Sequence, residues 1–234
     1  MRFSRILTTV AAGILAAGFS FNAAFAAPIV SASIVANGAP APFALEDFGN
    51  GPAVNLATGL VSSLPFTTST GVKVSFTGSS GVYSGDVNGQ TRSPFRDAGG
   101  VATDERYLNA RVGGSVKLEF GSLQTAFNLL WGSVDQSPAT YNLLSFTFSG
   151  GGITETVSGS QVFAAAGPGV VSGTTNLAVW ISNLNPFNTL TVTASQQAFE
   201  FAPGVPVPEP GSLALLGLGL AGLAAASRRK QKQA

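Results

Sequence analysis

Short runs of alternating apolar and polar residues constrain the fold of this chain more than any other feature of its sequence. Residues 72–77 read VKVSFT and residues 188–194 read NTLTVTA, so every second side chain is apolar. Because successive side chains of a β-strand point to opposite faces, this pattern is typical of strands with one buried face. Glycine, serine, asparagine and proline separate such runs, and residues 27–203 show no convincing helical periodicity. The sequence therefore predicts an all-β domain.

The spacing of the runs predicts how the strands are arranged. Further strand candidates are residues 28–36, 60–66, 125–131, 143–148, 153–158, 176–181 and 197–201. Roughly ten short strands at this spacing predict an antiparallel β-sandwich, jelly-roll-like, over residues 27–203. A β-solenoid is the alternative fold, but the chain has no fixed repeat period to support it.

One local pairing is predicted within residues 107–120, YLNARVGGSVKLEF. A three-residue hairpin loop over 113–115 would pair Val112 with Val116 and keep all the apolar side chains on one face. A two-residue loop would set apolar side chains opposite polar ones, because a one-residue slip moves every side chain to the other face. We therefore predict the longer loop, with a glycine in the left-handed conformation. The face expected in water carries Asn109, Arg111, Lys117 and Glu119.

Residues 1–26 have the layout of a secretory signal peptide. Arg2 and Arg5 precede an uncharged apolar segment, residues 6–21, and Ala24-Phe25-Ala26 is an A-x-A cleavage site before Ala27. An uncleaved N-terminal anchor is the alternative. We expect export through the Sec translocon and cleavage by signal peptidase.

The composition of residues 27–210 excludes several classes of function. Six basic and eleven acidic side chains give a net charge of −5 without a basic patch, which argues against nucleic-acid binding. The chain has no histidine and no cysteine, so Ser-His-Asp triads, cysteine nucleophiles, ordinary zinc sites and disulfides are excluded. No acidic pair is specified as catalytic by its spacing. We expect a protein that is not an enzyme and has no cofactor, unless it binds Ca²⁺.

The stretch WGSVDQSPATYN, residues 131–142, is the most distinctive part of the domain. Asp135 and Asn142 carry the oxygen ligands that Ca²⁺ prefers, and Trp131 or Tyr141 could stack on a sugar ring. The structural alternative is a core tryptophan at a strand end, followed by an Asp/Asn pair that caps a turn.

Two other segments have a similar choice of roles. Glu200 lies between Phe199 and Phe201 and could join the same metal or sugar site, or could simply point to water from an ordinary last strand. Residues 84–104 are polar and rich in glycine, and we expect them to form a long exposed loop without a fixed role.

The C-terminal residues divide into three parts. A proline-rich linker, residues 204–211, precedes a short apolar segment, residues 212–227, and a basic tail, residues 228–234. The fourteen uncharged residues 213–226 would span only about 21 Å as a helix, against about 30 Å of membrane hydrocarbon. Arg228, Arg229 and Lys230 should keep the tail in the cytoplasm. We expect a transient transmembrane helix; a plain single-pass anchor is the alternative.

Val207, Pro208, Glu209 and Pro210, followed by the glycine-rich apolar segment and the Arg-Arg-Lys cluster, resemble the PEP-CTERM sorting signal. Exosortase, a membrane cysteine protease-transpeptidase of Gram-negative bacteria, reads that signal. The resemblance implies an inner-membrane intermediate, cleavage near the motif, and delivery to the cell surface or extracellular matrix. It also implies a connection with exopolysaccharide and with biofilm or floc formation.

The body of the chain also resembles a family of exosortase-dependent surface proteins whose biochemical activity is undefined. The similar residues are Tyr107–Ala110, Leu130–Asp135, Tyr141-Asn142 and Ala198–Phe201. Relatives are expected to have an Asp-Asn pair where this chain has Ala202-Pro203. We expect an exported structural or exopolysaccharide-associated protein. The alternatives are a Ca²⁺-dependent carbohydrate-binding module and a polysaccharide-active enzyme.

Overall fold

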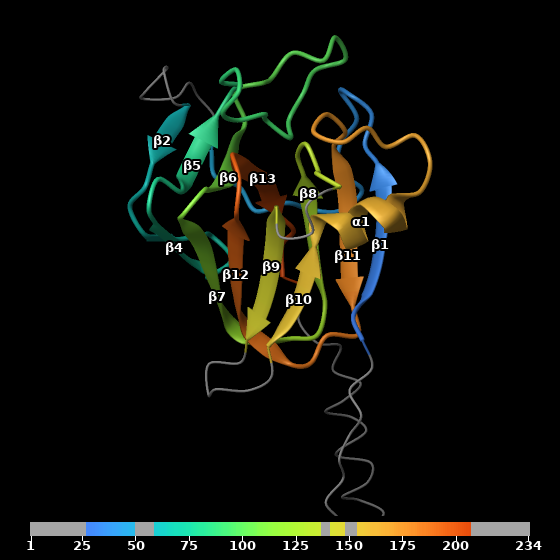
Figure 1. Cartoon of the computed structure of the whole chain (residues 1–234). Helices are drawn as coiled ribbons and strands as arrows, with labels where there is room; N and C mark the ends of the chain where they lie inside the picture. The colour runs from blue at the N-terminus through green and yellow to red at the C-terminus, as the bar shows by residue number, and fades with distance from the viewer. Residues whose placement is uncertain (1–26, 50–58, 137–140, 148–153, 207–234) are drawn as a thin grey trace, which may run out of the picture.

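Two antiparallel β-sheets make up most of the computed structural model, which describes residues 27–49, 59–136, 141–147 and 154–206 (Figure 1). One sheet has seven strands in the order β1-β11-β8-β13-β6-β5-β2, and the other has six in the order β10-β9-β12-β7-β4-β3. The elements are β1 (Ile29–Ile34), β2 (Leu60–Ser62), β3 (Phe66–Thr67), β4 (Lys73–Thr77), β5 (Gly81–Ser84), β6 (Arg106–Arg111), β7 (Ser115–Gln124), β8 (Phe127–Trp131), β9 (Asn142–Thr147), β10 (Glu155–Ser158), α1 (Gly159–Ala166), β11 (Leu177–Ser182), β12 (Phe187–Ala194) and β13 (Ala198–Pro203). The prediction of an antiparallel all-β fold is confirmed. The predicted signal helix and C-terminal helix lie outside the described residues.

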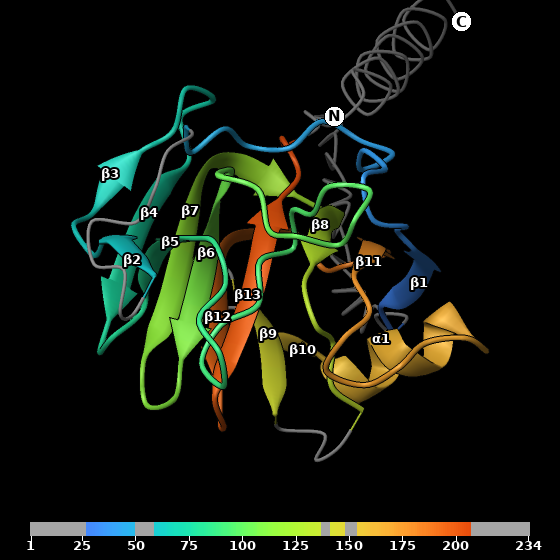
Figure 2. The same cartoon turned by 90° about the horizontal axis from the view of Figure 1, so that it is seen from above.

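The core lies between the two sheets, which face each other in Figure 2. Alternate side chains of each strand point into this core. In β12, for example, Leu190 and Val192 are fully buried, whereas Thr191 between them is only partly buried. Four phenylalanines from both sheets meet edge to face: Phe120, Phe127, Phe146 and Phe187. Such ring pairs add to the free energy gained from burial alone.

The predicted hairpin over residues 107–120 is wrong, because its two strands belong to different sheets. β6 pairs with β5 and β13, whereas β7 pairs with β4 and β12. Gly113 does take the expected left-handed conformation, with φ of 73°, but the turn crosses from one sheet to the other. The apolar faces of β6 and β7 therefore meet through side chains across the core. Alternation identifies which faces meet, and it does not say whether the two backbones also pair.

This crossing changes the exposure of two residues. Val112, expected on the apolar face, lies in the turn and is 58% exposed. Asn109, expected in water, is fully buried on the other face of β6. Lys117 and Glu119 do lie at the surface, and their side chains pair with each other.

The helix α1 was not predicted from the spacing of apolar residues, because eight residues are too few to show a helical period. Its start does have a sequence signal, a capping box: Gln161 N donates to Ser158 Oγ, and Ser158 N donates to Gln161 Oε1. Val162 is fully buried, and the helix lies beside β1 and β10, at the open side of the two sheets (Figure 2).

The two ends of the described chain lie at the same pole of the molecule. Asn183, just after β11, donates from Nδ2 to Ala27 O at 3.1 Å. Gly204 N donates to Asn128 O, near the start of β8, at 2.8 Å. Since Asn128 pairs with Trp180 near the end of β11, both contacts lie at the same ends of these strands. The opposite pole holds the end of β8 and the start of β13.

Candidate functional site

A polar cavity of about 630 Å³ opens at the pole away from Ala27 and Pro206. Its wall is built by the segment that follows β8, by Tyr141 just before β9, by Gly173 before β11, by the start of β13 and by the loop over residues 85–105. The charged or aromatic residues that line it are Asp86, Arg92, Arg96, Asp135, Tyr141 and Glu200. Three of the predicted candidates are therefore brought together: Asp135 and Tyr141, which are six positions apart, and the distant Glu200.

Glu200 lies buried on the side of β13 that faces this cavity. Phe199 and Phe201 point into the core, so strand alternation places Glu200 on the outer face of the seven-stranded sheet. The 85–105 loop covers it there and leaves it 3% exposed. Arg92 N donates to its Oε1 at 2.9 Å, and Ser133 Oγ donates to its Oε2 at 3.1 Å. The expectation that Glu200 points to water is wrong.

Burial raises the pKa of Glu200 to about 7, from an ordinary value of 4.5. Removal of the carboxylate from water is the main cause, because it disfavours the charged form. The hydrogen bonds from Arg92 and Ser133 oppose the shift, since they stabilise the carboxylate. The carboxyl group therefore changes its charge near neutral pH.

Gly132 and Ser133 shape the cavity floor where β8 ends. Gly132 N donates to Glu200 O at 2.8 Å, which holds the end of β8 against β13. A side chain at Gly132 would lie 3.1 Å from Arg92 O and 3.2 Å from Pro94 Cβ. Glycine therefore allows the 85–105 loop to approach. Ser133 has a positive φ of 47°, uncommon for this residue, and its hydroxyl reaches Glu200.

Asn109 lies directly opposite Glu200 in the register of β6 and β13. Its side chain is fully buried, and neither amide atom has a hydrogen-bond partner within the part of the chain that the structure describes. Buried amide groups normally have partners, because an unpaired one is costly. The buried Asn109 amide, next to Glu200, is therefore an exception to this rule.

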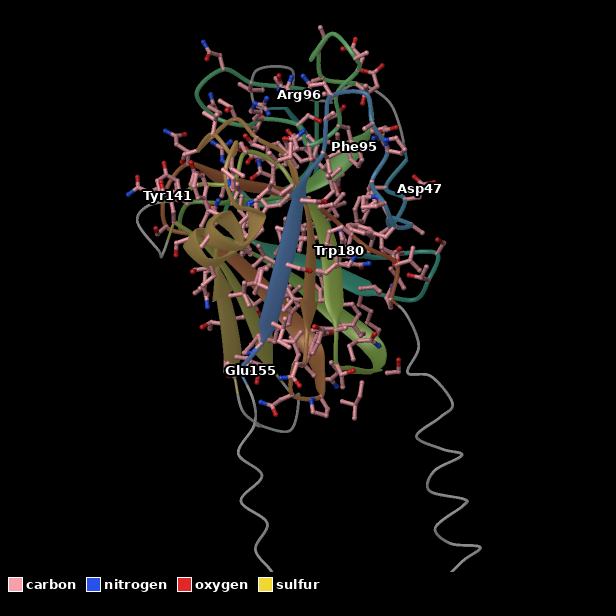
Figure 3. All side chains as sticks on the ribbon, turned by 90° about the vertical axis from the view of Figure 1, so that its right-hand side faces the viewer. Asp47, Phe95, Arg96, Tyr141, Glu155 and Trp180 are labelled. Atoms are coloured by element: carbon pink, nitrogen blue, oxygen red, sulfur yellow. The ribbon has the colours of Figure 1, made fainter. Side chains whose placement is uncertain are left out.

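The 85–105 loop is fastened at several points, contrary to the expectation of an exposed loop without a fixed role. Asp86 accepts a hydrogen bond from Ser93 N at 2.8 Å and pairs with Arg96 Nη2 at 2.6 Å. Asn176, just before β11, binds both Arg92 Nη1 at 3.3 Å and the backbone oxygen of Pro94 at 2.8 Å. Figure 3 shows Arg96 near the top of the molecule and Tyr141 lower down, at its left side. These contacts make the loop a fixed wall of the cavity.

The residues of this loop that line the cavity were missed as site residues. Arg92, Arg96 and Asp86 carried one available signal, a group of charges in a chain with few charges. Burial lowers the pKa of the Arg92 guanidinium, and the neighbouring Arg96 lowers it further.

Asp135 stands on the cavity wall just after β8. Its Oδ1 accepts a hydrogen bond from Ser172 Oγ at 3.5 Å. Burial raises its pKa, and Ser172 and Asn142 act in the opposite direction. The Asn142 amide nevertheless makes no hydrogen bond within 3.5 Å to any described residue. Asn142 itself is buried at 1% exposure.

Trp131 does not reach the cavity wall. It is fully buried and stacks on Phe199, with ring centroids 4.0 Å apart and planes inclined by 20°. Its ring therefore offers no open face to a sugar, and Tyr141 is the aromatic side chain on the wall. No three acidic side chains gather as a metal site within residues 27–49, 59–136, 141–147 and 154–206.

Comparison with known protein families concerns the C-terminal segment of the chain, not the cavity. The family model of the PEP-CTERM protein-sorting motif matches residues 206–230. The chain carries a PEP-CTERM sorting motif. The motif marks it as an exosortase substrate, exported across a membrane toward the cell surface. No curated protein and no solved structure matches the chain.

Most of the matched sorting motif lies outside the described residues. Pro206 alone belongs both to the matched segment and to the described chain. Ala24 and Ala26 of the predicted cleavage site, Val207–Pro210, and Arg228–Lys230 are not described. Within the described parts, no helix combines the length and apolarity needed to cross a membrane.

Proposed function

We propose that this PEP-CTERM protein is a non-enzymatic component of the cell surface or extracellular matrix that associates with exopolysaccharide through the polar cavity. The observation that carries the proposal is the cavity itself, at the pole opposite Pro206. A domain held by the segment after Pro206 would present this cavity away from the membrane.

The chemistry of the wall supports a saccharide ligand. Sugar hydroxyl groups both donate and accept hydrogen bonds, and the wall offers carboxyl, guanidinium and hydroxyl groups. The apolar face of a sugar ring packs on aromatic side chains, and Tyr141 supplies such a ring. Recognition sites commonly combine an aromatic wall with a few fixed polar groups.

The proposed route follows from the two terminal segments. The Sec translocon and signal peptidase would act on residues 1–26, and exosortase on the matched segment of an inner-membrane intermediate. The final location would be the surface or matrix of a Gram-negative bacterium, with a role in biofilm or floc structure.

Two alternatives each have one supporting observation. A polysaccharide-active enzyme is supported by two carboxyl groups of raised pKa, Asp135 and Glu200, on one cavity. Against it, both oxygens of Glu200 already accept hydrogen bonds from the protein. A Ca²⁺-dependent module is supported by Asp135 with Asn142 beside it.

Calorimetric titration of the exported protein with exopolysaccharide from the producing cells tests the proposal. Tyr141→Ala should weaken binding about tenfold, the loss of about 1.4 kcal/mol of ring contact. Lys117→Ala, on the outer surface of the six-stranded sheet, is the control. Unchanged affinity in Tyr141→Ala would contradict the proposal. New reducing ends that Glu200→Gln abolishes would establish the enzyme, and loss of binding in EDTA would establish the Ca²⁺ module.

A further inference from the structure

Four strands form the edges of the two described sheets, and β1 differs from the other three. β2 has three residues and an irregular register, β3 has two residues, and β10 has four. Short or irregular edges resist pairing with other chains. β1 has six residues, IVSASI, without charge or proline. It is the longest of these four edges, and it has neither a charged residue, a proline nor an irregular register.

The free side of β1 presents backbone groups in a regular row. Val35 N donates to Asn176 O at 3.0 Å, so the odd-numbered residues of β1 bond toward β11. The N–H and C=O groups of Val30, Ala32 and Ile34 therefore point away from the sheet, because neighbours alternate in an antiparallel ladder. Figure 3 looks onto this edge, and α1 lies beside the strand rather than across it.

We propose that a second copy of this chain pairs with β1 along this edge, antiparallel and about a two-fold axis. The pairing would join the seven-stranded sheets of two copies into one continuous sheet. A two-fold interface brings the same surface of both copies together, so the strand must be complementary to itself.

The sequence of β1 meets that requirement in one register. With Ala32 opposite Ala32 of the second copy, Val30 lies opposite Ile34, and each apolar side chain meets another. The outward groups of Val30, Ala32 and Ile34 then bond one another. On the other face Ser31 lies opposite Ser33, so no like charges meet. Ile34, now 46% exposed, would become covered.

Charge substitutions on the exposed serines test both the pairing and its register. The measurement is the mass of the exported protein by light scattering, with melting curves to check that each variant folds. The unmodified chain should be a dimer. Ser31→Lys with Ser33→Lys sets lysines opposite each other and should give monomers. Ser31→Lys with Ser33→Glu sets opposite charges together and should restore the dimer.

A single introduced cysteine gives an independent test, because the chain has none of its own. In the proposed register Ala32→Cys lies opposite itself, and paired strands bring Cα atoms within disulfide reach. Oxidation should link Ala32→Cys into covalent dimers. Ser31→Cys is the matched control, since it lies opposite Ser33 and should link poorly. A monomeric unmodified chain, an undiminished dimer with two lysines, or equal linking at both cysteines would overturn the proposal.

Discussion

The backbone N–H of Arg92 donates a hydrogen bond to Oε1 of Glu200 at 2.9 Å, although the two residues lie 108 positions apart in the sequence. This bond holds the 85–105 loop over a buried carboxyl group. Loop position, cavity shape and the charge of one side chain are therefore linked.

Replacing Glu200 with glutamine should remove a pH dependence of stability. The pKa of Glu200 is about 7 in the folded chain, against an ordinary value of 4.5 that applies when the chain is unfolded, so the folded chain binds more protons between these values. The contribution of Glu200 to the free energy of unfolding is fully present below about pH 4.5. It is lost as the pH rises to about 7, and the total loss is about 3 kcal/mol. Urea unfolding at pH 5 and pH 8 should show this loss in the unmodified chain and much less of it in Glu200→Gln. Equal losses in both would contradict the assignment. Glu119→Gln, at an exposed position, is the control.

Gly132→Ala should destabilise the fold by about 1–3 kcal/mol, because the added methyl group lies against Arg92 O and Pro94 Cβ. Gly121→Ala is the matched control: it also adds a methyl group next to a strand backbone, but no atom lies within 4 Å. Its effect should stay within about 0.5 kcal/mol. Thermal unfolding measures the loss of stability in both variants. Equal losses would show that the 85–105 loop moves away from the added methyl group without a cost in stability.

Asp86→Ala should free the 85–105 loop, since it removes both the acceptor for Ser93 N and the partner of Arg96. Limited digestion with trypsin should then cut after Arg92 and Arg96 several times faster than in the unmodified chain, because proteases act on opened backbone. Asp47→Ala removes a carboxylate that accepts a hydrogen bond from nearby Gly49 N, and it should leave the cleavage rate unchanged. If the unmodified loop is cut as fast as the Asp86 variant, the contacts of Asp86 do not hold the loop.

Processing at the sorting motif predicts a shortened mature protein. Mass spectrometry of the surface-exposed form should find no peptide from residues 228–234. Glu209→Ala, within the matched segment, should leave the C-terminal peptide attached and the protein in the membrane fraction. A surface form that still ends in Ala234 would show that the motif is not cleaved.

Strands such as β9 could be predicted because only one of their faces is buried, so that apolar and polar residues alternate along them. β13 is buried on both faces and shows no such alternation in burial. Which strands pair with each other could not be predicted in the same way. Leu108 and Leu118 needed apolar neighbours, and a facing sheet supplies them as well as an adjacent strand does.

Only part of the candidate site could be predicted from the sequence. Asp135, Tyr141 and Glu200 are residue types suited to binding, and their type alone selected them. That Glu200 would be covered depended on how a distant loop folds over β13. The burial of Trp131 has another cause, because its ring packs in the core against Phe199. Pairing of Asp86 with Arg96 is local, but nothing in the sequence indicates that this loop lies on Glu200 rather than in water.

β13 is the last strand of the described residues and yet lies in the middle of its sheet, between β6 and β8. In N-to-C export, the seven-stranded sheet therefore remains split in two until residue 203 has crossed the membrane. The next residues to arrive are those of the sorting motif, from Pro206. Because pairing of distant strands is slow, the sheet would be completed no earlier than the motif reaches the membrane. Order in the sequence would thus place the end of folding after the arrival of the sorting motif.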